Sequence, residues 1–208
     1  MRPGSVIIKE CPVCSLLIRQ YTITSGNTFG AILWTDGKRY APMLPDQPLL
    51  VMCPLCQTLV WIDELRVISE DGSQKDSHGY FDKSVAYEMP SFNDYVTFLE
   101  NNLLPSRKEH YVRLRLWWLD NDVRRDNANE IPLSSREMSN LTAFAELLNE
   151  ENATDLLMKA EVMRELGRFD EANALLSRLT DRDLSKVAKF IKGLVIQGDY
   201  HVRKVHIK

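Results

Sequence analysis

The sequence predicts an α+β protein in which a small β-rich module is followed by a helical module. Two observations support this division. All four cysteines of the 208-residue chain lie before residue 57, and near residue 91 the spacing of apolar residues becomes the three-and-four spacing of helices. We therefore expect a β-rich domain over residues 1–70, a linker over 71–90 and a helical domain over 91–208.

The cysteines form two pairs with closely similar local sequences, Cys-Pro-Val-Cys at 11–14 and Cys-Pro-Leu-Cys at 53–56. Two short-spaced pairs of thiols match the ligand set of one tetrahedral metal site, and the proline in each pair fixes a φ angle of the turn. The sequence therefore predicts that one metal ion is bound by Cys11, Cys14, Cys53 and Cys56.

Zinc in a structural role is the first expectation for this site, because four thiolates leave no coordination position open for water or substrate. Iron stays open as an alternative, because four cysteines also suit a single iron ion. A redox-active dithiol is a further alternative. Such dithiols usually begin a helix, whereas strand-like residues follow both pairs here.

Strand-like runs, rich in β-branched and aromatic residues, follow the cysteine pairs at Leu16–Ile23 and Thr58–Ile62. With the cysteine spacing, they resemble the zinc-ribbon and rubredoxin-like families, in which two such turns hold one metal between β-hairpins. The resemblance covers residues 5–68. In these families glycine often follows the second cysteine in a left-handed backbone, whereas this chain has Ser15 and Gln57.

The cysteine pairs are separated by 38 residues, positions 15–52, rather than the roughly 15 to 20 of a compact ribbon. Turn signals at 25–27 and 36–38 flank a strand-like run over Thr28–Trp34, so the additional residues predict an inserted hairpin. In the linker, the lone histidine His78 has no partner motif and is not expected to bind metal.

Helical spacing begins at Phe92, with Ser91 as the expected N-cap, and continues in a second helix over Tyr111–Leu119. Polar residues over 120–130 interrupt the pattern, and a third helix is expected from about Ser135 to Leu148.

The clearest helical signal is a hairpin of two helices between Ala153 and Leu179. Gly167 is suited to end the first helix in a left-handed cap, and Asp170 is suited to cap the second. The turn over residues 166–172 resembles that of a tetratricopeptide repeat.

This resemblance implies structural roles for Gly167, Phe169 and Ala172 and a helical, repeat-like domain. Lys159 departs from the family, which prefers a large apolar residue there. A second Gly-x-aromatic turn follows at Gly198, 31 residues later (198 − 167), near the family period of roughly 34. An ordinary helical bundle with one repeat-like hairpin remains the alternative. The overall arrangement is similar to an uncharacterised group of bacterial proteins with N-terminal cysteine pairs and C-terminal tetratricopeptide-like helices.

The formal net charge is −3, and charges are balanced along the chain, with six basic and six acidic residues in 1–70. This balance argues against nucleic-acid binding. Because no apolar stretch is long enough for a signal peptide or a membrane span, we expect a cytoplasmic protein without a membrane partner. In a reducing compartment, paired cysteines more often bind metal than form disulfides.

No phosphate-binding loop, nucleophile elbow or histidine-rich metal motif occurs, so no catalytic residue is predicted. We expect a non-enzymatic protein whose helical domain binds a protein or peptide. Two alternatives stay open. One is a nucleic-acid-associated factor that uses Trp34 and the basic-aromatic residues 38–40, and the other is a rubredoxin-like iron electron carrier.

Overall fold

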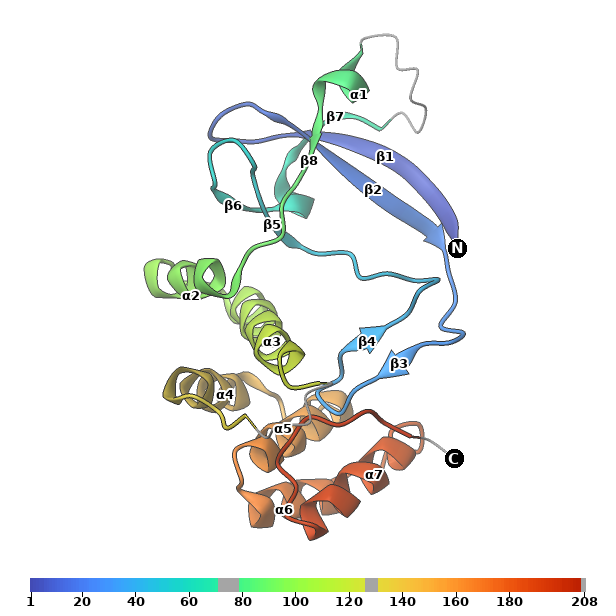
Figure 1. Ribbon diagram of the computed structural model, residues 1–208, viewed down its shortest axis with the longest axis vertical. Helices are drawn as coiled ribbons and strands as arrows, with labels where there is room; N and C mark the ends of the chain where they lie inside the picture. The colour runs from blue at the N-terminus through green and yellow to red at the C-terminus, as the bar shows by residue number, and fades with distance from the viewer. Residues whose placement is uncertain (71–78, 126–130, 207–208) are drawn as a thin grey trace. The chain divides into compact units, whose positions relative to one another are not determined.

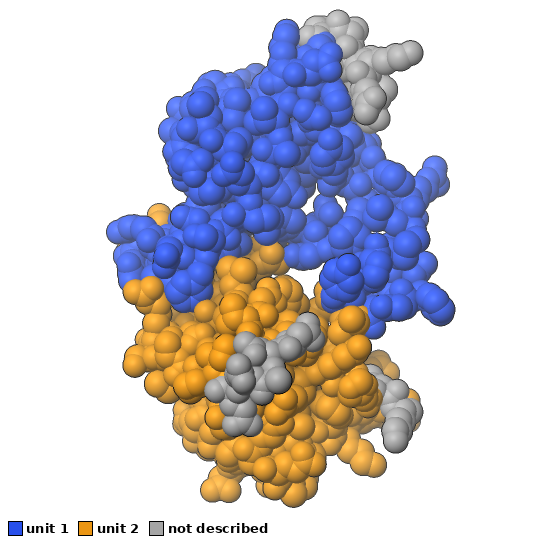
Figure 2. Space-filling view, viewed as in Figure 1, with its two compact units in different colours: residues 1–31, 40–101 blue, residues 32–39, 102–208 orange. Residues whose placement is uncertain are grey.

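The computed structural model describes residues 1–70, 79–125 and 131–206, and it confirms the α+β class, with a strand-rich N-terminal region and helices later in the chain (Figure 1). The chain divides into two compact units (Figure 2). Unit 1 comprises residues 1–31 and 40–101, and unit 2 comprises 32–39 and 102–208. His78 and the rest of the predicted linker from 71 to 78 lie outside the described residues.

Unit 1 contains a four-stranded sheet in the order β7-β1-β2-β8. Strand β1 (Arg2–Glu10) pairs antiparallel with β2 (Leu17–Ser25) and with β7 (Arg66–Ser69), and β8 (Val85–Ala86) is parallel to β2. The strand predicted after the first cysteine pair is therefore β2. The residues 79–90, placed in the linker by the sequence analysis, contain β8 and the short helix α1 (Tyr80–Lys83).

The second cysteine pair lies between the two strands of a small antiparallel hairpin, β5 (Leu50–Met52) and β6 (Leu59–Trp61), which the 3-10 helix η1 (Ile62–Glu64) follows. Apolar side chains of this hairpin pack with those near the first pair. The buried members of this core are Cys11, Ile18, Val51, Cys53, Val60, Ile62 and Leu65.

The last element of unit 1 is α2 (Phe92–Asn101). Ser91 caps it as predicted, because its hydroxyl oxygen accepts a hydrogen bond from the Asp94 amide at 3.3 Å. The Asp94 carboxylate accepts in return from the Ser91 amide at 2.8 Å. These reciprocal bonds satisfy amide groups that have no partner within the helix.

Unit 2 contains the helices α3 (Ser106–Asp122), α4 (Ser135–Leu147), α5 (Ala153–Glu165), α6 (Phe169–Arg178) and α7 (Ser185–Ile196), and each packs against the next in the chain. Their apolar faces form one core. Its buried residues are Trp117, Leu141, Phe144, Ala145, Leu148, Leu156, Ala160, Val162, Met163, Ala172, Leu175, Leu176, Ile191 and Val195. In the described part of the chain, no helix combines the length and apolarity needed to cross a bilayer.

The turn between α5 and α6 confirms the predicted left-handed cap at Gly167, whose φ is +74°. The Arg168 amide donates to the Met163 carbonyl at 2.8 Å and the Gly167 amide to the Arg164 carbonyl at 2.9 Å, which is the Schellman pattern. Helix α6 begins at Phe169, so Asp170 lies in its first turn rather than at the cap. In that turn its negative charge still interacts favourably with the positive end of the helix dipole.

Gly198 ends α7 with the same geometry, at φ +66°. Its amide donates to the Val195 carbonyl at 3.1 Å, and the Asp199 amide donates to the Leu194 carbonyl at 3.0 Å. No further helix follows Gly198 in the described residues, and the Val205 amide donates to the Leu33 carbonyl at 2.8 Å. The recurring Gly-x-aromatic motif therefore marks two helix ends but only one helical hairpin within the described residues.

The inserted hairpin between the cysteine pairs is short, with β3 (Ile32–Leu33) and β4 (Arg39–Tyr40) joined by a turn in which Gly37 has φ +79°. Residues 32–39 belong to unit 2. There the Thr35 amide donates to the Arg203 carbonyl at 2.9 Å, so the hairpin pairs with the C-terminal segment as well as with itself.

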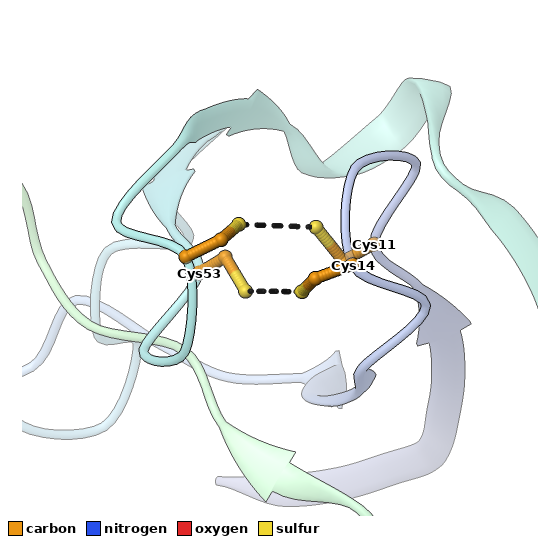
Figure 3. Close-up of side chains that lie close together, drawn as sticks. Cys11, Cys14 and Cys53 are labelled. Carbon is orange, nitrogen blue, oxygen red and sulfur yellow. Dashed lines mark hydrogen bonds between the residues drawn. The ribbon is translucent and has the colours of Figure 1, made fainter.

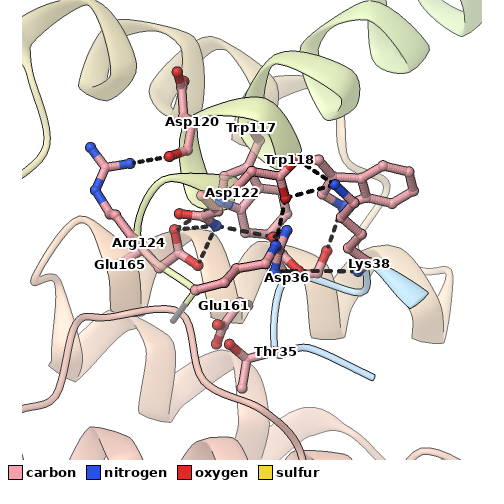
Figure 4. Close-up of polar contacts among 12 residues, drawn as sticks. Thr35, Asp36, Lys38, Trp117, Trp118, Asp120, Asp122, Arg124, Glu161 and Glu165 are labelled. Carbon is pink, nitrogen blue, oxygen red and sulfur yellow. Dashed lines mark hydrogen bonds and ion pairs between the residues drawn. The ribbon is translucent and has the colours of Figure 1, made fainter. Parts of the chain in front are cut away.

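The side chain of Asp36, in this turn, is fully buried among residues of α3 and the chain directly after it (Figure 4). Its carboxylate accepts hydrogen bonds from the Arg125 guanidinium at 3.2 and 2.6 Å and from the Asn121 amide group at 3.0 Å. The Trp118 indole donates to the Asp36 backbone carbonyl at 3.1 Å. A buried carboxylate is tolerated only when it is paired and hydrogen-bonded, and these contacts meet that condition.

Glu165 of α5 extends this network. Its carboxylate accepts from the Trp117 indole at 2.8 Å and from Asn121 at 3.1 Å, and next to it Glu161 accepts from Arg164 at 2.8 Å. We call this group the buried polar cluster, and its members are Asp36, Trp117, Asn121, Arg125, Glu161, Arg164 and Glu165. It holds three carboxyl groups against two guanidinium groups. Burial, together with the nearby charge of Glu161, raises the pKa of Glu165 to about 8.

Replacing Glu165 with Gln is expected to remove a pH dependence of stability. The pKa of Glu165 rises from an ordinary 4.5 to about 8 on folding, so the folded chain holds a proton that the unfolded chain loses. Its contribution to stability is complete below about pH 4.5 and is lost as the pH rises to about 8, at up to ~1.4 kcal/mol per pH unit. Urea unfolding at pH 5 to 8 should show wild type declining relative to Glu165→Gln.

The matched control is Glu146→Gln, since Glu146 is an exposed glutamate of α4. Its free energy of unfolding should follow the wild-type profile with pH. Parallel profiles for wild type and Glu165→Gln would contradict a protonated Glu165 in the folded chain.

Candidate metal centre

The two cysteine turns have one backbone conformation although they lie far apart in the sequence. In the first, the Ser15 amide donates to the Cys11 carbonyl and the Cys11 amide to the Leu16 carbonyl, both at 2.9 Å. In the second, the Gln57 amide donates to the Cys53 carbonyl at 2.9 Å and the Cys53 amide to the Thr58 carbonyl at 3.0 Å. The same pair of backbone hydrogen bonds therefore closes both turns.

Ser15 and Gln57 occupy the positions where related turns often carry glycine, and both have φ of +58°. Among the described residues, they are the non-glycine residues with positive φ. For a residue with a Cβ, the left-handed backbone conformation costs roughly 1 kcal/mol or more. The backbone geometry that the resemblance implies is thus present without the glycines that usually provide it.

The four Sγ atoms converge at the facing ends of the two turns, all within 4.8 Å of one another (Figure 3). Cys11 and Cys56 Sγ are 3.7 Å apart, and Cys14 and Cys53 Sγ are 3.6 Å apart. A tetrahedral ion with bonds of about 2.3 Å would separate its sulfur ligands by about 3.8 Å, whereas a disulfide bond is about 2.05 Å long. The four cysteines are therefore positioned to hold one metal ion.

Burial differs within each pair. Cys11 and Cys53 are completely buried in the apolar core of unit 1, whereas Cys14 and Cys56 are partly exposed. The apolar side protects the centre from water, and the ligand set offers thiols alone. Such a set favours soft or borderline metal ions over magnesium or calcium.

Hydrogen bonds and burial shift the pKa values of the thiols in different directions. The Thr58 hydroxyl and backbone amide lower the pKa of Cys56 to about 6. Burial raises the pKa of Cys53. At Cys14 the Leu16 amide favours the thiolate, but burial and the neighbouring thiols outweigh it and raise the pKa to about 12. A bound cation would favour all four thiolates, and the amide donors would then stabilise their charge.

Thr58 contributes to the centre although it is not one of the predicted ligands. Its hydroxyl oxygen lies 3.4 Å from Cys56 Sγ. The available signal was its position two residues after the second cysteine of its pair, where the first pair has the apolar Leu16. The two turns therefore share their backbone but differ in the donors around one sulfur.

Comparison of the chain with models of protein families, with curated proteins and with solved structures finds no match.

A substitution of Ser15 by Val should destabilise unit 1, because a β-branched side chain is poorly tolerated at a φ of +58°. We expect a loss of about 1–2 kcal/mol in the free energy of unfolding, measured by urea titration of the full chain. Ser5→Val is the matched control, since Ser5 is also an exposed serine of unit 1 but lies in β1, where β-branched residues are favoured. Equal stability of the two variants would show that the left-handed backbone is not retained.

Proposed function

We propose that this chain is a non-enzymatic protein-interaction protein in which a structural zinc ion stabilises unit 1 and the helices of unit 2 bind a protein partner. The observation that carries the proposal is the sequential packing of α3 to α7, each helix on the next, with an open groove along the last of them. Arrays of this kind commonly present extended surfaces to peptides or helices.

Zinc is the ion that this centre suits best. Four thiolates at tetrahedral separations complete the coordination of zinc and leave no position for a substrate, which supports a structural rather than a catalytic role. The apolar core of unit 1 is small, and it includes two of the cysteines themselves. A metal that joins its two halves therefore supplies stability that so small a core does not provide alone.

The helical part supports the interaction role by its resemblance to tetratricopeptide repeats. The turn at Gly167 has the left-handed cap that lets α5 and α6 pack closely, and Ala172 is fully buried between helices. The proposed repeat-like character rests on this one hairpin and on the sequential order of packing.

Metal content tests the first half of the proposal. Protein purified without added metal should contain one zinc ion per chain by plasma mass spectrometry and be colourless. Chelation, or Cys56→Ser, should destabilise unit 1 by on the order of several kcal/mol, seen as faster amide exchange in residues 1–70. One iron ion with visible thiolate absorption would replace zinc and support the electron-carrier alternative. Protein without metal and with oxidised cysteines would remove the centre altogether.

Affinity capture tests the second half. The metal-loaded full chain should recover a partner protein at near-stoichiometric amount under mild conditions, and the tagged partner should recover this chain in return. Recovery of nothing in both directions contradicts an interaction role, whatever the metal proves to be.

A further inference from the structure

A groove of 700 Å³ runs along α7 in unit 2. It combines apolar residues with three positively charged or titratable side chains. The lining residues are Lys186, Lys189, Phe190, Gly193, Leu194, Gln197 and His206. Its size is that of sites which hold a small ligand or a short stretch of peptide.

The groove residues of α7 lie on one face of the helix. Lys186, Phe190, Gly193 and Gln197 follow one another at spacings of three and four. The opposite face carries Ile191 and Val195, four positions apart, into the core of unit 2. One face of α7 thus packs in the core of unit 2, and the other lines the groove.

Charge in the groove is of one sign. Helix α7 contains lysines at 186, 189 and 192 and no acidic residue, and none of the described lining residues is acidic. None of these lysines has an ion-pair partner among the described residues, whereas cations elsewhere in unit 2 do, as in Arg113–Glu109 and Lys159–Glu150. A positive groove in a chain of net charge −3 is complementary to an acidic ligand.

Two residues of this face lower the stability of α7. Gly193 stands in its interior, where glycine lowers helix stability relative to alanine. Its φ is not in the left-handed region, and a Cβ added there would meet no atom within 4 Å. Lys186 lies in the first turn, where the helix dipole disfavours a cation. Nothing in the described fold requires either residue.

We propose that the α7 groove binds an acidic amphipathic helix of a partner protein, an inference that rests on the proposed protein-interaction role. Apolar side chains of the partner pack on Phe190, which is half-buried at the groove. The absence of a side chain at Gly193 lets the partner backbone approach α7 closely. Carboxylates of the partner pair with Lys186 and Lys189 at the rim.

The test is selection of binding peptides from a display library of random sequences about 14 residues long, four turns of helix, against the metal-loaded full chain. We expect enrichment of peptides with Asp or Glu beside apolar residues at spacings of three and four. Fluorescence anisotropy of the most enriched peptide should show affinity about tenfold weaker for the double variant Lys186→Glu/Lys189→Glu. Gly193→Leu should weaken it similarly, and added salt should weaken binding to the wild type.

These variants separate binding from folding. Glu at position 186 interacts favourably with the helix dipole, and leucine at 193 favours the helix over glycine, so Lys186→Glu/Lys189→Glu and Gly193→Leu should unfold no more easily than wild type. Arg136→Glu is the matched control, because Arg136 is an exposed cation in the first turn of α4 and does not line the groove. Its affinity for the peptide should stay within about twofold of wild type.

Enriched peptides without acidic residues, or equal binding by the charge-reversed chain, would overturn the proposal. So would a wild-type dimer that the charge reversal dissociates, since the groove would then hold a second copy. Peptides that bind elsewhere on the chain would refute the groove assignment and leave the interaction role standing. Failure of reciprocal affinity capture would instead remove that role.

Discussion

Burial of the Asp36 carboxylate is the constraint on which unit 2 depends most. Asp36 lies in residues 32–39, which belong to unit 2 although the chain on both sides of them belongs to unit 1. The chain therefore changes unit after residues 31, 39 and 101. The partners of Asp36, Arg125 and Asn121, come from the end of α3 and just beyond, and Asn121 also reaches Glu165 of α5. Because an unpaired buried charge is very costly, these bonds fix the insert, α3 and α5 in one arrangement.

The metal centre shows the same dependence of local conformation on long-range contacts. Ser15 and Gln57 adopt a left-handed backbone that glycine would adopt without strain. Such strain persists when the surrounding structure determines the conformation strongly. Here each turn is closed by two backbone hydrogen bonds, and its sulfurs meet those of the other turn at 3.6 and 3.7 Å. The left-handed backbone, which the local sequence does not favour, thus accompanies the convergence of four cysteines positioned to hold one ion.

The two units also differ in what they leave available for function. In unit 1 the four cysteine sulfurs face one another, so they are positioned to bind one shared ion. In unit 2 the residues that the fold does not explain, Gly193 and Lys186, face outward along α7. Residues that lower the stability of their own helix are expected where a surface is used for binding. The candidate metal centre and the proposed recognition surface therefore lie in different units.

The sequence by itself determined the elements whose signals are local: the cysteine turns, the strands after them, the Ser91 cap and the left-handed Gly167 cap. Each depends on residues within a few positions of one another. Tertiary structure alone decided that the insert belongs to unit 2 and that residues 79–90 contribute a strand to the sheet. It also decided that burial raises the pKa of Glu165. These outcomes depend on which distant groups share a desolvated site, and polar residues such as Asp36 look like ordinary turn residues until their buried partners are known.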